Sequence, residues 1–227
     1  MSPRQKMINM MYLVLMALLA LNVSKEILKS FHLFEQSFNS AASNIDAKNT
    51  VTMSALESKY KEKPKKTKPY YDRAKKVQST ADEFVKSIDE LIAKVEGMYG
   101  GAEARNEEDE MLAADQMEKH ANYFGPENQN KGIELQATIN KAREDMLSFL
   151  KPDPKDTLFK IKGGNEEYEK ALEACQLWAK DGEKKGSWVN DNLVHVPAAG
   201  LMAIFSRIKN DAKTLEEDVL EKLAAQV

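Results

Sequence analysis

The stretch AKKVQSTADEFVKSIDELIAKVEGM (residues 74–98) has the clearest helical pattern in the chain. Its apolar residues recur at every third or fourth position: Ala74, Val77, Ala81, Phe84, Ile88, Leu91, Val95 and Met98. This spacing places them on one side of an α-helix, where they form a seam that packs against other helices. Gly100 and Gly101 follow and are expected to end the helix, because glycine readily adopts the left-handed backbone of a helix C-terminus.

The same spacing recurs in three further segments, which we expect to be helices. The apolar positions are Leu28, Phe31, Phe34, Phe38, Ala41 and Ile45 in the first segment, Leu135, Ile139, Ala142, Met146 and Phe149 in the second, and Leu201, Phe205, Ile208, Ala212, Leu215 and Val219 in the third. Residues 28–60, 70–99 and 197–226 would each form a rod roughly 45–50 Å long. Three rods of similar length predict an elongated helical bundle. Strand-type alternation is nearly absent, so the fold class is predicted to be all-α.

The connections between these helices are predicted from prolines, glycines and polar runs. The lysine-rich run at 61–69 contains two prolines and is expected to form a turn. A short helix is expected at 111–120, after the acidic run 106–110. Residues 151–165 are expected to form a loop, and the next helix is expected to continue through Trp178.

Near the N-terminus lies an uncharged apolar segment, MINMMYLVLMALLALNV (residues 7–23). Its polar side chains are those of Asn9, Tyr12 and Asn22. As a helix it would be roughly 25 Å long, at the short end of what crosses a bilayer. We predict a cytoplasmic N-terminus at 1–6, a transmembrane helix at 7–24 and a periplasmic helical bundle at 25–227. The basic residues Arg4 and Lys6 predict this orientation, since they favour the cytoplasmic side.

Two alternatives compete with the membrane anchor. A secretory signal peptide also has basic residues before an apolar stretch, but the exit LALNVS (residues 19–24) offers no clean pair of small residues for cleavage. A buried core helix is the other alternative, although cores seldom place so uniformly apolar a helix at a chain terminus. The chain also stops at Val227 inside a helical pattern, which we interpret as truncation of a longer protein.

Composition and motifs argue against several classes of function. The chain has 33 basic and 36 acidic side chains and a net charge of −3, which predicts no nucleic-acid partner. Cys175 is the single cysteine, so no internal disulfide can form, and we expect it to be a small core residue. The three histidines His32, His120 and His195 are scattered without metal-ligand spacing. No nucleotide-binding or hydrolase motif occurs. We therefore predict no enzyme activity, no catalytic residue, no metal and no cofactor.

The polar residues around the apolar segment are the candidate functional residues. Arg4 cannot be discharged in a protein, and it either fixes topology from the headgroup region or faces a partner's carboxylate inside the membrane. Tyr12 lies too deep for the interfacial belt of tyrosines, so its hydroxyl requires a partner in the membrane. Lys6 and Asn9 are weaker candidates. The segment contains no Asp, Glu or His, so proton coupling would need an acidic residue from another subunit.

The sequence resembles the GldM/PorM family of gliding-motility and type IX secretion motor subunits. The resemblance is carried by SPRQKMINMMYLV (residues 2–14) and MALLALNVSKE (16–26), and by LVHVPAAG (193–200) and KNDA (209–212). It implies one membrane helix, a helical first periplasmic domain and further β-sandwich-like domains, absent here, that reach the outer-membrane machinery.

The resemblance also implies partners and a mechanism. In the family, a homodimer of these helices sits inside a ring of the polytopic partner GldL, and proton flow drives rotation of one relative to the other. The family's membrane arginine and tyrosine match Arg4 and Tyr12, and the arginine is thought to face a glutamate of the partner ring. The alternative functions are a membrane-anchored periplasmic sensor, which would need a second membrane helix and an output module, and an inert anchored scaffold.

Overall fold

The computed structural model describes residues 5–13, 25–126, 129–152, 158–182 and 187–227. Regular structure in these ranges is helical, with no strand, so the prediction of an all-α fold is confirmed there. The elements are α2 (Lys25–Glu62), α3 (Pro64–Met98), the 3₁₀ turn η1 (Gly101–Glu103), α4 (Glu118–Phe124), α5 (Lys131–Ser148), α6 (Asn165–Ala174), the π-helical turn η2 (Asn190–Val194) and α7 (Ala198–Ala224). Residues 5–13 are also helical.

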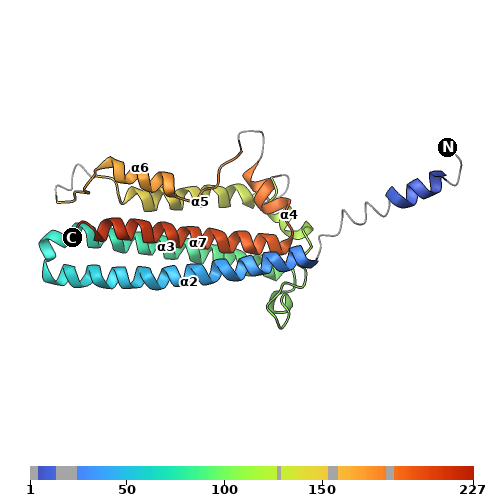
Figure 1. Ribbon diagram of the computed structural model, residues 1–227, viewed down its shortest axis with the longest axis horizontal. Helices are drawn as coiled ribbons and strands as arrows, with labels where there is room; N and C mark the ends of the chain where they lie inside the picture. Colours follow the sequence, from blue (N-terminus) through green and yellow to red (C-terminus); the bar gives the residue numbers. More distant parts are fainter. Residues whose placement is uncertain (1–4, 14–24, 127–128, 153–157, 183–186) are drawn as a thin grey trace.

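Three long helices, α2, α3 and α7, lie side by side and form the body of the molecule (Figure 1). The central one is α7, which packs against both α2 and α3 and is the most buried helix. Every residue of its predicted seam is buried: Leu201, Phe205, Ile208, Ala212, Leu215 and Val219. The predicted bundle of three rods is therefore confirmed.

A second layer, made by α5 and α6, covers one side of this bundle (Figure 1). Helix α5 packs on α3 and α7 through Leu135, Ile139 and Met146, which are buried as expected. Helix α4 closes one end of the layer, where the ring of Phe124 lies edge-on against Phe205 of α7 at 6.0 Å between centroids. These aromatic contacts join the two layers into one core.

The predicted apolar stripe of α2 is only partly buried. Among Leu28, Phe31, Phe34, Phe38, Ala41 and Ile45, Phe34 is 55% exposed and the other five are half-buried. The buried residues are His32, Glu35, Ala42, Asn49 and Leu56, most of which are polar. The physical reason is that α2 has neighbours on one side only, and polar groups of α2 are needed there to pair with buried charges. The stripe therefore lies along the border of the buried face, where the Phe31 ring lies close to Gly200 of α7.

The predicted lysine-rich turn at 61–69 is wrong, since only Lys63 separates α2 from α3. Pro64 is the first residue of α3, where its missing N–H leaves no hydrogen bond unmade. Pro69 lies inside α3 and removes one helical hydrogen bond. The buried Thr67 ties the two helices together at the junction, because its hydroxyl donates a 3.4 Å hydrogen bond to the carbonyl of Lys59.

Two predicted helix ranges are also wrong. The helix expected to run through Trp178 ends at Ala174. Trp178 lies in a segment without regular structure, whose Ala179 exchanges two hydrogen bonds with the Asn140 side-chain amide. This pairing replaces the helical hydrogen bonds of Ala179. Cys175, at the end of α6, is half-buried and packs against the core. The short helix expected at 111–120 instead begins at Glu118.

The predicted transmembrane helix at 7–24 falls partly outside the described residues, which omit 14–24. None of the helices within the described ranges has both the length and the apolar character needed to cross a bilayer. The boundaries predicted at residues 6 and 24 stay predictions.

We predict that Gly132→Ala destabilises the domain, because Gly132 brings α5 close to the chain that precedes η2. A Cβ atom at this position would overlap a methyl group of Val189 and lie 2.6 Å from the carbonyl oxygen of Phe124. Thermal unfolding followed by circular dichroism should show a loss of about 1–3 kcal/mol. The matched control is Gly97→Ala in α3, where nothing lies within 4 Å, and it should gain up to about 1 kcal/mol. Equal effects of the two variants would contradict the close approach at Gly132.

Candidate functional site

The structure describes three of the four residues predicted from the N-terminal segment. Lys6, Asn9 and Tyr12 lie three residues apart in the helical stretch 5–13, and all three are exposed, Tyr12 by 66%. This spacing places neighbouring members on one side of the helix. Arg4 lies outside the described residues. The structure therefore brings none of the described candidates into a buried site.

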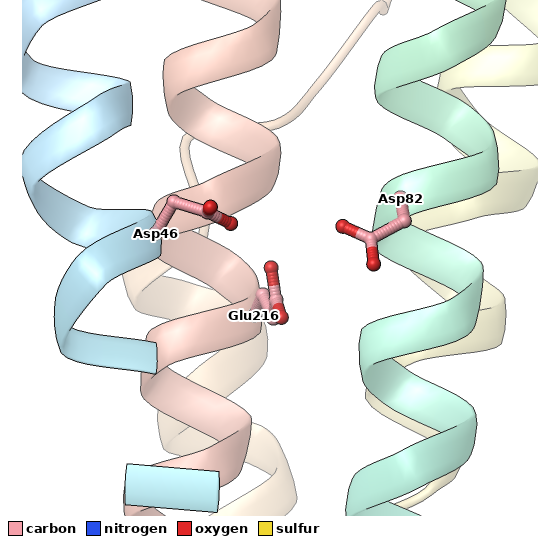
Figure 2. A group of neighbouring side chains, drawn as sticks. All are labelled: Asp46, Asp82 and Glu216. Carbon is pink, nitrogen blue, oxygen red and sulfur yellow. The ribbon is translucent and has the colours of Figure 1, made fainter. Parts of the chain in front are cut away.

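A cluster of charged residues that the sequence did not predict lies inside the bundle. The Lys213 ammonium on α7 is 2.6 Å from a carboxylate oxygen of Asp46 on α2 and 2.6 Å from one of Asp82 on α3. It also lies 3.0 Å from Oε2 of Glu216, one turn further along α7. We call these four residues the Lys213 cluster. Figure 2 shows its three carboxyl groups directed from three helices toward the space between them.

Burial makes this cluster energetically important. The Lys213 side chain is 9% exposed and the Glu216 side chain is fully buried, whereas Asp46 and Asp82 reach solvent. A buried ammonium is stable only when its donors are paired, and here three carboxylates accept them. The cluster therefore ties α2, α3 and α7 together at one level of the bundle.

The environment shifts the titration of both buried members. Burial raises the pKa of the Glu216 carboxyl to about 7, against the lowering influence of Lys213. Burial by itself would lower the pKa of Lys213, but its hydrogen bonds to Asp46 and Asp82 and the charge of Glu216 raise that pKa above its usual range. Oε1 of Glu216 is buried without a hydrogen-bond partner, which agrees with a carboxyl that burial drives toward its neutral form.

The three carboxyl groups also have a spacing that could suit a metal ion. Their ligand oxygens all lie within 4.8 Å of one another, and a hard divalent cation prefers such oxygen ligands. The Lys213 ammonium lies among these oxygens and already contacts all three groups, so it supplies the positive charge that they require. We therefore assign the cluster a structural role and not a metal-binding one.

A second charged cluster, formed by Arg105, Glu35 and Glu96 and called the Arg105 cluster, holds the segment after α3 against the bundle. The Arg105 guanidinium donates to Glu35 of α2 at 2.6 Å and to Glu96 of α3 at 2.7 Å. It also donates to the backbone carbonyl of Asp109 at 2.8 Å. Asn106 completes the acidic turn by accepting from the backbone N–H groups of Glu108 and Glu110. Charge-assisted bonds of this kind fix the position of the turn.

One of the scattered histidines lies in the core. Nε2 of His120 donates to the carbonyl of Val196 at 2.9 Å, so Nδ1 accepts from the Tyr99 hydroxyl at 2.8 Å. Burial lowers the pKa of His120, which keeps the ring neutral. His120 therefore joins the end of α3 to the segment before α7 and has no ligand to offer a metal.

The sequence carried a weak signal for the Lys213 cluster. Glu216 lies four residues after Ala212 and three before Val219, so it occupies the apolar seam itself. A charged residue on such a seam requires a buried partner. Nothing in the sequence indicates that Asp46 and Asp82, more than 100 residues away, supply the partners of Lys213.

Comparison with protein families supplies the identity of this bundle. The family model for the GldM N-terminal domain matches residues 26–226, which include every helix of the bundle apart from the first residue of α2. The chain belongs to the GldM family. No curated protein matches the chain.

Membership in the GldM family identifies the chain as a component of the gliding-motility and type IX secretion machinery. GldM proteins are membrane-associated secretion components and not a known enzyme family. The predicted resemblance is therefore confirmed.

We predict that Lys213→Met costs about 3–5 kcal/mol of folding free energy, because it leaves the buried Glu216 carboxyl without its cation and removes the ion pairs to Asp46 and Asp82. Urea unfolding of the wild type and the variant would measure this loss. Lys209→Met is the matched control on the same helix, since Lys209 pairs only with the half-exposed Asp89. It should cost less than about 1 kcal/mol. A Lys213→Met loss no larger than that of the control would contradict the role assigned to the cluster.

A second prediction concerns pH. Because folding raises the Glu216 pKa to about 7, the stabilising contribution of this group is complete at acidic pH and is lost as the pH rises through 7. Unfolding free energies measured from about pH 5 to about pH 8 should fall with pH in the wild type and change less in Glu216→Gln. The control Glu217→Gln alters the neighbouring carboxylate, which pairs with the exposed Lys48, and should keep the wild-type slope. The same slope in Glu216→Gln and the wild type would contradict the assignment.

Proposed function

We propose that the chain is part of a subunit of a proton-motive-force-driven rotary motor in the bacterial inner membrane, which powers type IX protein secretion and gliding motility. The observation that carries the proposal is the family match over 26–226 directly after an uncharged apolar segment at 7–23. The apolar segment would be the single membrane helix, with its N-terminus in the cytoplasm, and the bundle would lie in the periplasm.

The bundle is suited to carry torque. α2 has 38 residues and α3 has 35, so α2 alone is roughly 57 Å long. The Lys213 and Arg105 clusters each join two or more helices through short ion pairs. Long helices that are cross-linked in this way resist sliding past one another, which supports a role as a stiff lever.

The energy-converting step would take place at the membrane helix. Arg4 would attract an ionised glutamate of a ring formed by a GldL-like polytopic partner, and the attraction would fall when that glutamate is protonated. A proton crossing ~100 mV makes roughly 2.3 kcal/mol available per charge, enough to bias successive contacts around a ring. Tyr12 would supply a polar contact deeper in the membrane, with Lys6 and Asn9 as weaker candidates.

The proposal includes a homodimer. Three exposed apolar side chains of α2 support it, because Ile27, Leu33 and Phe34 are each at least half exposed. Burying these side chains against those of a second copy would remove apolar surface from water, which favours association. Further domains beyond the bundle would connect the motor to the outer-membrane machinery.

We expect Arg4→Ala and Arg4→Lys to abolish secretion and gliding while the protein still inserts and co-purifies with its partner. Lysine keeps the positive charge but not the forked geometry of arginine, so it should not restore transport. Lys6→Ala is compared with them, because it removes one positive charge from the same short segment at a weaker candidate residue. It tests whether the charge only sets topology.

Two outcomes would decide against the motor assignment. Normal transport in both Arg4 variants would reduce Arg4 to a topology residue and leave an anchored scaffold as the function. Equal loss in Arg4→Ala and Lys6→Ala, accompanied by failed insertion, would lead to the same conclusion. Insertion is measured by protease digestion of spheroplasts, in which a periplasmic bundle is cleaved and a bundle left in the cytoplasm is protected.

A further inference from the structure

A pocket of about 410 Å³ lies where the first turns of α2 meet the segment 106–114. We call it the α2 pocket. The side chains on which the following argument depends are Lys25, Lys29 and His32 from α2, and Glu108, Glu110 and Leu112 from the opposing segment. The Arg105 cluster holds this segment in place, so the wall opposite α2 is fixed by short ion pairs. The volume suits a small polar molecule or the polar end of a larger one.

The charges of the pocket are separated by element. Lys25 and Lys29, one turn apart on α2, have no ion-pair partner among the described residues. The acidic side chains Glu108 and Glu110 come from the opposing segment. Glu35 also lines the pocket, but its carboxylate is held by Arg105 at 2.6 Å. The pocket therefore offers cations on one wall and anions on the other, which is complementary to a zwitterion.

A buried donor in the pocket wall lacks an acceptor. The Gln36 amide donates to Nε2 of His32 at 2.9 Å, so in the neutral ring the hydrogen lies on Nδ1. Nδ1 is buried and has no hydrogen-bond partner, because the nearest carboxylate oxygen, from Glu35, is 3.7 Å away. His32 as a whole is only 8% exposed. Leaving such a donor unpaired is costly, and a small rotation of the ring would offer it to an oxygen of a bound ligand.

The rim of the pocket is apolar on one side. Leu112 is 65% exposed and Leu28 is half-buried, and both line the pocket. A freely soluble zwitterion would not use these side chains. A ligand whose polar end continues into a hydrocarbon chain would cover them and gain from their burial.

We propose that the α2 pocket binds the headgroup of a zwitterionic phospholipid that carries a phosphate and a primary ammonium group. The phosphate binds Lys25 and Lys29 and accepts from His32, and the ammonium donates to Glu108 and Glu110. The glycerol end of the lipid lies over Leu28 and Leu112. A quaternary ammonium, which has no N–H to donate, fits this acidic wall less well.

The position of the pocket in the chain agrees with this ligand. The pocket begins at Lys25, which directly follows the apolar segment at 7–23. If that segment spans the membrane, as the proposed function requires, Lys25 lies at the depth of the outer headgroups. The lipid would then hold the near end of the bundle at the membrane surface and fix its tilt.

The test measures lipid binding by the full chain in detergent micelles, using the shift in thermal unfolding followed by circular dichroism. The probes are dihexanoyl-phosphatidylethanolamine, dihexanoyl-phosphatidylcholine, free phosphoethanolamine and inorganic phosphate. We expect the ethanolamine lipid to bind at least about fivefold more tightly than the choline lipid and both soluble compounds. Lys25→Ala/Lys29→Ala should weaken binding of the ethanolamine lipid about tenfold. Glu108→Gln/Glu110→Gln should abolish the preference for the ethanolamine lipid over the choline lipid.

The matched control is Lys65→Ala/Lys66→Ala, which removes two exposed lysines at the start of α3 and should leave binding unchanged. Equal binding of the ethanolamine and choline lipids would overturn the zwitterion assignment. Equal binding of free phosphoethanolamine and the lipid would overturn the lipid assignment, and equal binding of inorganic phosphate would reduce the site to a simple anion site. Lipid binding is measured without motor activity. The lipid proposal can therefore be contradicted while the Arg4 variants still block transport, and the motor proposal can be contradicted while the lipid still binds.

Discussion

The buried ammonium group of Lys213 fixes how α2, α3 and α7 are placed along one another. Apolar seams by themselves hold helices together but specify their axial position poorly, since similar side chains recur every turn. A shift of one turn, about 5.4 Å, would re-form many apolar contacts of α7. It would also separate Lys213 from Asp46 and Asp82 and leave Glu216 buried without a cation. The charged cluster therefore selects one register among several that the seams permit.

The sequence predicted the fold where periodicity and burial coincide. The seams of α3 and α7 were found because their residues face other helices, and regular spacing is then visible in the chain. The pattern of α2 was equally regular, but the most buried positions beside its stripe include the polar residues Glu35 and Asn49, which apolar periodicity does not reveal. Pro64 and Pro69 were interpreted as a break because proline usually ends a helix, but Pro64 begins one.

The charged clusters could not be predicted from the sequence, for a different reason. Lys213, Asp46 and Asp82 come from three helices, and Arg105 reaches Glu35 across 70 residues. Such pairings depend on tertiary packing, which leaves no local pattern in a single sequence. The N-terminal candidates were accessible to sequence reasoning because their significance comes from the apolar segment in which they are placed. The family match covers residues 26–226 and does not include these N-terminal candidates, so their role stays a proposal.

The connection between α2 and α3 has a mechanical consequence. Only Lys63 lies between the two long helices, and the Thr67 hydroxyl donates a hydrogen bond to the carbonyl of Lys59. The connection therefore has little conformational freedom. A twist applied at the start of α2 cannot be absorbed by a loosely coiled linker at its far end. It must pass into α3 or be stored as elastic strain in the pair. The hairpin of α2 and α3 therefore responds to torsion as one elastic unit, and its torsional stiffness is that of the two helices.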